Sequence, residues 1–188
     1  VENGMKLVHK FFGAGWVKLL FPWGTNILLT WQEYFAQDLS NERRLFHHRG
    51  EFLIWDDILA RLQSFARNGA GRALVLSGGG GQGKSRLLLE LAKTLETQAD
   101  VPRVKFLRIG GRSLDDESLD LISREKNSVL IVEDAHRLDE ALGQVAIAAA
   151  CADNVRLLVA TRPQAREAVI SALARHGYAE RLESPLNL

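Results

Sequence analysis

A glycine-rich segment that ends in lysine and serine is the part of this sequence whose residue types and spacing most directly suggest chemistry. Residues 78–85 read Gly-Gly-Gly-Gly-Gln-Gly-Lys-Ser and fit the pattern G-x-x-x-x-G-K-S/T at every fixed position. A phosphate group is bound well by several backbone N–H groups that converge on it, and residues without side chains let the backbone curl closely enough. The segment therefore predicts a phosphate-binding loop.

The residues of this segment have distinct expected roles at a nucleoside triphosphate. The glycines supply the curl, Lys84 brings a positive charge to the β and γ phosphates, and Ser85 offers its hydroxyl to Mg²⁺. A helix that begins here points the positive end of its dipole at the anion. We therefore expect ATP and Mg²⁺ as ligands. The residues expected to contact the nucleotide are Gly78, Gly79, Gly80, Gly81, Gln82, Gly83, Lys84, Ser85 and Arg86.

The elements on either side of the segment are those that a phosphate-binding loop requires. An apolar run, residues 74–76, precedes it and has the composition of a buried strand. Apolar residues recur at helical spacing after it, so the following helix has a face that can pack on a sheet; they are Leu87, Leu88, Leu91, Ala92 and Leu95. A chance match of the glycine pattern would not bring this context with it.

Two further apolar strands end in polar residues that could reach the same site. Residues 129–132 form a fully apolar run followed by Glu133 and Asp134, and residues 155–160 are followed by Thr161 and Arg162. Helical segments separate these strands, so the pattern predicts a parallel sheet covered by helices on both faces. Ligands of such sheets bind at the carboxyl ends of the strands. All three polar clusters are expected there.

The outlying elements can also be predicted from the residue pattern. A helical stripe from residue 52 should end near Asn68-Gly69, and residues 104–109 alternate like a strand. Ser113 with Asp116 resembles a helix cap. Further helices are expected over residues 138–152, closed by Asp153-Asn154, and over residues 163–176, with a final short strand over residues 180–183.

Over residues 46–188 the sequence resembles the STAND class of P-loop ATPases, the signal-transduction ATPases with numerous domains, within the AAA-like division. The resemblance rests on the segments 46–51, 78–85, 129–136, 158–163 and 182–186. It implies an α/β fold of the P-loop NTPase type: a three-layer sandwich around a five-stranded parallel sheet of order 5-1-4-3-2. It also implies that residues 46–188 are the NTPase domain, without the lid and downstream domains, so that the chain is a fragment.

The resemblance implies roles for four further residues. Glu133 matches the Walker B acid that holds the Mg²⁺ shell, and Asp134 matches the acid that polarises the attacking water. Arg162 matches the arginine that reads the γ phosphate, and Arg49 lies in the segment that borders adenine. The order of acids departs from the usual Asp followed by Asp or Glu, which lengthens the metal ligand and shortens the base. Slow hydrolysis, or binding without turnover, is therefore expected.

Residues 1–45 are expected to form an apolar and helical N-terminal extension. Residues 11–30 are rich in apolar and aromatic side chains, but glycine, proline, asparagine and lysine interrupt them. Basic residues precede this stretch and acidic residues follow it, which would place the ATPase outside the cytoplasm if the stretch were a membrane span. Interfacial or partner binding, and packing on this or a missing domain, are therefore favoured over a span.

Composition narrows the class of protein. The formal net charge of +1 does not indicate nucleic acid as a partner, and a single cysteine, Cys151, permits no internal disulfide and fits a cytoplasmic setting. The leading hypothesis is an ATP-dependent switch in a larger signalling or defence protein, which self-associates or binds partners through the missing domains. The alternatives are a small-molecule kinase and a nucleotide-binding scaffold without turnover. A GTPase is disfavoured because no N-K-x-D segment is present.

Overall fold

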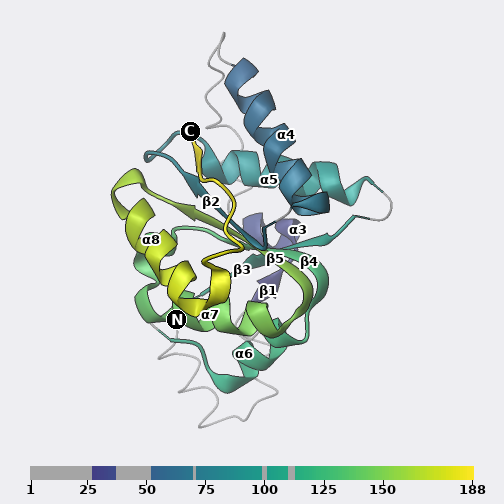
Figure 1. Ribbon diagram of the computed structural model, residues 1–188. Helices are drawn as coiled ribbons and strands as arrows, with labels where there is room; N and C mark the ends of the chain where they lie inside the picture. Colours follow the sequence, from purple (N-terminus) through teal and green to yellow (C-terminus); the bar gives the residue numbers. More distant parts are fainter. Residues whose placement is uncertain (1–26, 37–51, 70, 99–100, 110–112) are drawn as a thin grey trace.

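The structure is a computed structural model that describes residues 27–36, 52–69, 71–98, 101–109 and 113–188. Its centre is a twisted six-stranded sheet (Figure 1). The first strand in this order is antiparallel to its neighbour, and every other pair is parallel. From one edge to the other the strands are β1 (Leu28–Leu29), β3 (Arg103–Leu107), β4 (Lys126–Val132), β5 (Asp153–Thr161), β2 (Ala73–Ser77) and β6 (Leu186–Asn187).

The sheet differs from the predicted one by its sixth strand. The parallel strands β6, β2, β5, β4 and β3 follow the order expected for strands 5-1-4-3-2, but the prediction of a five-stranded sheet was wrong because β1 pairs with the free edge of β3. Both leucines of β1 are buried, and the Arg108 N–H donates to the Ile27 carbonyl at 2.9 Å. Two residues are too few to show a periodic pattern, so the sequence does not signal this strand.

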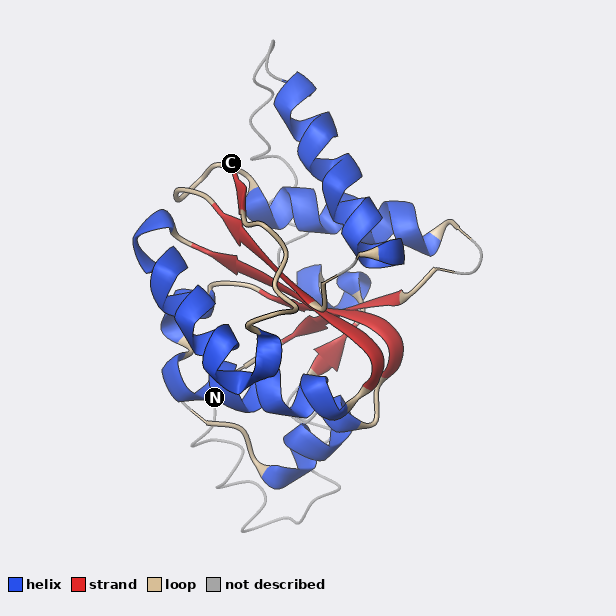
Figure 2. Ribbon diagram, viewed as in Figure 1, coloured by secondary structure: helices blue, strands red, loops and turns tan. Residues whose placement is uncertain are grey.

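Helices cover both faces of the sheet, which gives three layers (Figure 2). Alternate residues of the same strand enter different layers: Leu157 and Val159 pack with one set of helices, and Leu158 and Ala160 with the other. The first set is α6 (Asp116–Ser123), α7 (Asp139–Cys151) and α8 (Arg166–Leu173); the second is α3 (Trp31–Phe35), α4 (Phe52–Asn68) and α5 (Lys84–Glu96). The predicted three-layer α/β arrangement is therefore confirmed.

Several predicted boundaries were right and others were wrong. Helix α4 ends at Asn68 as expected, whereas β4 begins at residue 126 and β5 at residue 153, both earlier than predicted. The cap of α6 is Asp115, whose carboxylate accepts the Ser118 N–H at 2.8 Å, rather than Ser113 with Asp116. Asp115 is the better cap because its carboxylate lies within reach of the free N–H groups of the first turn.

The end of the chain departs most from expectation. The helix predicted over residues 163–176 is divided into a 3₁₀ turn (Pro163–Ala165), α8 and a wider turn (Ala174–Tyr178), where Gly177 has φ +92°. The strand predicted over residues 180–183 is absent from that range. Leu182 forms only an isolated bridge to Ala73, and β6 lies further along the chain.

Residues 27–36 of the predicted N-terminal extension pack against the rest of the domain. Trp31, Tyr34 and Phe35 of α3 contact the core cluster that also holds Phe106 of β3. The predicted boundary at residue 45 and most of the stretch 11–30 lie outside the described residues. Of the helices that the structure does describe, none has the length and apolar character needed to cross a membrane.

The core predicts a large difference in stability between two aliphatic truncations. Leu158 is fully buried in the centre of the sheet, whereas Ile147 of α7 is 52% exposed. We expect Leu158→Ala to lower the free energy of unfolding by about 2–5 kcal/mol and Ile147→Ala to change it by less than about 0.5 kcal/mol. Urea unfolding followed by circular dichroism measures both, and equal losses would contradict the assigned core.

Candidate functional site

The glycine-rich loop joins the end of β2 to the start of α5, and the two neighbouring strands anchor its base. The Gly78 N–H donates to the Thr161 carbonyl of β5 at 3.2 Å, and the Leu188 N–H donates to the Ser77 carbonyl at 2.8 Å. At the other end of the loop the Leu87 N–H donates to the Gly83 carbonyl, which begins the helix. The loop is therefore fixed at both ends while residues 79–83 lie at the surface or partly exposed.

Glycine is required at particular positions of the loop. Gly81 and Gly83 have φ values of +78° and +84°, which L side chains rarely adopt. A Cβ on Gly78 would lie 3.0 Å from the Cβ of Leu188, whereas one on Gly80 would meet no atom within 4 Å. The side-chain oxygen of Gln82 accepts a hydrogen bond from the Gly79 N–H and so ties the loop across its turn. Both fixed glycines of the sequence pattern, Gly78 and Gly83, are thus constrained, and so is Gly81 at a variable position.

Lys84 lies over the loop that precedes it. Its ammonium donates to the carbonyls of Gly78 and Gly79 at 2.8 and 2.9 Å. Partial burial lowers the pKa of Lys84, and the carboxylates of Asp134 and Glu133 oppose this shift. The charge is therefore held at the mouth of the loop on a flexible stem, within reach of an anion that the loop binds.

Glu133 follows β4 directly and is the most enclosed carboxylate of the site. It accepts hydrogen bonds from the hydroxyls of Ser85 and Tyr34. Burial raises the pKa of Glu133, and these two hydrogen bonds oppose the shift. Ser85 and Glu133 thus present a hydroxyl and a carboxylate side by side, and these are the hard oxygen donors that Mg²⁺ prefers.

The donor set at Ser85 and Glu133 fits a magnesium ion that also binds a phosphate. Mg²⁺ in proteins usually keeps several waters and takes only one or two carboxylates together with substrate phosphates. Within the described part of the chain no cluster of three or more His, Cys, Asp or Glu side chains could hold a metal ion by itself. Ser85 and Glu133 would therefore leave most ligand positions of the ion to water or to a bound phosphate.

Asp134 adopts the left-handed conformation, with φ +48°, and its side chain is 52% exposed. Its carboxylate lies 3.9 Å from Nδ1 of His136 and 3.7 Å from the guanidinium of Arg137. These separations are long and the groups are partly exposed, so both pairs are weak. Asp134 therefore stays available to water in front of the loop.

Arg162 follows β5 and is exposed. Its charge contributes to lowering the pKa of Lys84 and that of His136, although burial is the main cause for both groups. Arg162 therefore lies close to the mouth of the loop. The predicted residues Lys84, Ser85, Glu133, Asp134 and Arg162 are brought together at the carboxyl ends of three adjacent parallel strands.

Two further predicted nucleotide contacts, Arg86 and Arg49, stay predictions. The guanidinium of Arg86 forms an ion pair with Glu90 at 2.8 Å along α5, so its charge is already partly neutralised. Arg49 lies outside the described residues. Another arginine near the strand ends, Arg166, donates to Glu167 at 3.0 Å and to Asn187 at 3.2 Å.

Sequence reasoning missed Tyr34, which reaches the site from α3. The sequence from Trp31 onward does predict a short helix, and α3 confirms it, with Thr30 and Glu33 as a capping box at its start. No pattern in the sequence connects Tyr34 with Glu133, because the contact depends on the pairing of β1 with β3. Only the structure shows that the hydroxyl reaches the carboxylate.

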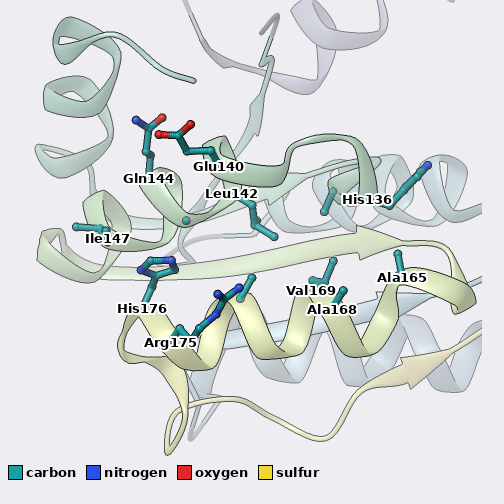
Figure 3. A pocket seen from close by; sticks show the side chains of 13 residues that line it. His136, Glu140, Leu142, Gln144, Ile147, Ala165, Ala168, Val169, Arg175 and His176 are labelled. Carbon is teal, nitrogen blue, oxygen red and sulfur yellow. The ribbon is translucent and has the colours of Figure 1, made fainter. Parts of the chain in front are cut away.

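A separate pocket of about 600 Å³ lies between α7 and α8 (Figure 3). His136 and His176 lie at opposite ends of it in the figure, and Glu140 and Arg175 also line it. None of residues 78–85 is among its lining residues. The pocket is therefore distinct from the phosphate-binding loop, and His136 is the lining residue that contacts Asp134.

Comparison with models of known protein families finds no match, and no curated protein matches the sequence. Solved structures are similar to part of the chain, and three of them are described by their identity to it and TM-score. They are a DNA polymerase III gamma subunit-related protein from Thermotoga maritima (14% identity, TM-score 0.47), PCH-2 from C. elegans (16%, 0.45) and Hsp104 with ATPγS and casein in a closed state (16%, 0.45).

The similarities cover 69%, 73% and 83% of this chain but only 45%, 42% and 30% of those three proteins. The chain thus spans less than half the length of each of these three proteins.

The loop geometry predicts that alanine at two glycines of the loop, Gly83 and Gly80, changes the free energy of unfolding by different amounts. Gly83→Ala forces a side chain into the left-handed region and should lower the free energy of unfolding by about 1–2 kcal/mol. Gly80→Ala meets open space and should be close to neutral. Urea unfolding compares the two variants. Equal stability would contradict the described loop conformation.

Proposed function

We propose that this chain is a Mg²⁺-dependent ATP-binding module of the P-loop NTPase type that hydrolyses ATP slowly. The observation that carries this proposal is that the predicted phosphate-binding and metal-binding groups converge at the carboxyl ends of β2, β4 and β5. The glycine loop and Lys84 follow β2, the Glu133 carboxylate bonded to Ser85 follows β4, and Arg162 follows β5. A triphosphate with a divalent cation is the ligand that uses all of these groups at once.

The loop and Lys84 would bind the phosphates together. The carbonyls of Gly78 and Gly79 now accept the hydrogen bonds of the Lys84 ammonium. A phosphate oxygen bears a full negative charge and is a stronger acceptor than a neutral carbonyl, so the ammonium would exchange partners when ATP binds. The start of α5 adds its dipole and free N–H groups to the same anion.

The metal would be held by the Ser85 hydroxyl and, through its water shell, by Glu133. When bound, Mg²⁺ would neutralise charge on the phosphates. Glu133 already accepts a hydrogen bond from Ser85, so the two groups are oriented toward one another before a ligand arrives. Preorganisation of this kind reduces the free energy spent on ordering the side chains during binding.

Asp134 is the better of the two acids for activating water. It lies in front of the loop and is half-exposed, whereas Glu133 is enclosed and already bonded to two hydroxyls. A short carboxylate in a left-handed turn is less well placed to reach the attacking water than a longer one would be. We therefore propose slow turnover, with Asp134 as the group that accepts the proton.

Within this proposal the module is a nucleotide-controlled switch of a larger cytoplasmic protein of the STAND type, with a role in signalling or defence. Arg162 would contact the γ phosphate of ATP and lose that contact in ADP, so the two nucleotides would stabilise different arrangements. Self-association or partner binding through further domains would then differ between the ATP-bound and the ADP-bound state. The exposed free Cys151 fits a reducing compartment.

A small-molecule kinase is less well supported by the same residues. It would need an acceptor pocket open to the γ phosphate and free arginines around it. The described pocket between α7 and α8 contains no loop residue, and Arg166 is bonded to Glu167 and Asn187. A nucleotide-binding scaffold without turnover would use the same loop, Lys84 and Ser85, and only the release of phosphate by the parent chain separates it from an ATPase.

The proposed phosphate contact predicts the effect of removing Lys84. Lys84→Ala should weaken ATP binding by about tenfold to a hundredfold, because a hydrogen bond to a charged group contributes about 1.5–3 kcal/mol. Lys93→Ala, on the same helix but next to Trp31, is the matched control and should bind ATP like the parent. Isothermal titration gives the affinities, and phosphate release measures turnover of the parent. Equal ATP affinity in the Lys84 variant would refute the proposal.

Substitution of Arg162 tests whether the protein is a switch that responds to the γ phosphate or a protein that binds ATP and ADP alike. Arg162→Ala should weaken ATP binding about tenfold or more and leave ADP binding within a factor of about two, because only ATP carries the γ phosphate. Arg124→Ala is the control, since Arg124 is 76% exposed and pairs with Asp120. A parallel loss for both nucleotides, or no loss, would show that Arg162 does not read the γ phosphate.

A further inference from the structure

Tyr34 places a phenol hydroxyl on the carboxylate that follows β4. It comes from α3, far from Glu133 in the sequence, and the hydroxyl donates its hydrogen bond to that carboxylate. Glu133 accepts its other side-chain hydrogen bond from Ser85. The enclosed carboxylate is thus held between the loop on one side and the N-terminal segment, residues 27–36, on the other.

The ring of Tyr34 is fixed by its neighbours. It stacks on Phe106 with ring centres 4.8 Å apart and an angle of 27°, and it meets Phe35 edge-on at 5.1 Å. Phe106 is fully buried in β3, so the platform under the ring belongs to the core. The guanidinium of Arg108 lies 5.8 Å from the centre of the ring. These contacts leave the hydroxyl little freedom to point elsewhere.

The helix that carries Tyr34 is itself tied down at several points. Thr30 and Glu33 form a reciprocal capping box at its start. Arg108 donates to the carbonyls of Glu33 and Tyr34 at 3.5 and 3.4 Å, and the Trp31 indole donates to Glu96 of α5 at 2.6 Å. The pairing of β1 with β3 holds the preceding residues. The segment is thereby attached to both the sheet and the helix that begins at the loop.

We infer that Tyr34 is a positioning residue of the magnesium site, which makes the N-terminal segment part of the nucleotide-binding machinery. This inference rests on the proposed function. Groups that hydrogen-bond to a metal ligand orient it, and their removal commonly weakens metal binding by about tenfold to a hundredfold. Without the Tyr34 hydroxyl, Glu133 would lose one of its two side-chain donors in an enclosed place and would be free to turn away from Ser85.

Through Tyr34 the N-terminal segment, residues 27–36, can act on the magnesium site. A rearrangement of residues 27–36 that withdrew Tyr34 would weaken Mg²⁺ binding without touching the phosphate loop. The reverse effect follows by linkage. If Mg²⁺ with ATP binds more tightly when Tyr34 orients Glu133, then Mg²⁺ with ATP also favours the docked position of α3. Residue 34 is thus placed to couple the preceding chain to the nucleotide.

The test removes one oxygen atom and measures the dependence of ATP binding on Mg²⁺. Tyr34→Phe keeps the ring stack on Phe106 and deletes only the hydroxyl. Tyr178→Phe is the matched control, because Tyr178 is the other tyrosine of the chain and its hydroxyl has no hydrogen-bond partner among the described residues. The ATP dissociation constant is measured by isothermal titration in EDTA and at a series of free Mg²⁺ concentrations, and thermal unfolding checks each variant.

We expect Tyr34→Phe to require about tenfold more Mg²⁺ for half of the full gain in ATP affinity, while its affinity in EDTA stays within about twofold of the parent. Tyr178→Phe should match the parent in both. Arg108→Ala, which releases the carbonyls of Glu33 and Tyr34, should shift the Mg²⁺ dependence in the same direction and keeps the test decisive if Tyr34→Phe unfolds.

An unchanged Mg²⁺ dependence in Tyr34→Phe would overturn the inference alone. A loss of ATP affinity that is equal with and without Mg²⁺ would also overturn it, because a purely structural role acts on both measurements. Failure of the parent itself to bind ATP would instead overturn the proposed function, so the two failures are distinguishable.

Discussion

The site depends on the parallel register of three strands, β2, β4 and β5. Ser77 lies beside Thr161 and Val132 beside Val159, so these strands end at nearly the same level. Each is buried on both faces, and a shift by one residue would move every side chain to the opposite layer. The register that fills the two cores therefore also fixes where the loop, Glu133 and Arg162 meet.

Much of this arrangement could be predicted from the sequence because it is local or follows from chain order. The loop pattern, the apolar run before Glu133 and the apolar run before Arg162 each occupy neighbouring residues. Their convergence follows from the rule that alternating strands and helices form a parallel sheet. The surroundings of Lys84 are consistent with this convergence. Burial is the main cause of the lowered pKa of its ammonium, and the charges of Asp134, Glu133 and Arg162 are near enough to affect it as well.

The contacts that could not be predicted join distant parts of the chain through short elements. Strand β1 has two residues, and Tyr34 lies on a helix of five residues. Such elements carry too few residues for a periodic signal, and their position depends on the free edge of β3 and on the ring of Phe106. The strand β6 was misplaced for a related reason, because Leu182 makes one bridge and the chain pairs again only at Leu186.

The most direct measurement of the central claim follows the backbone amides of the parent chain by ¹⁵N NMR while ATP and Mg²⁺ are added. The account predicts that the largest chemical-shift changes fall on residues 79–85 and on Glu133, Asp134 and Arg162, the ends of three different strands. It also predicts small changes around His176 in the pocket between α7 and α8. Changes centred on that pocket, or none at the loop, would contradict the claim that these strand ends form one nucleotide site.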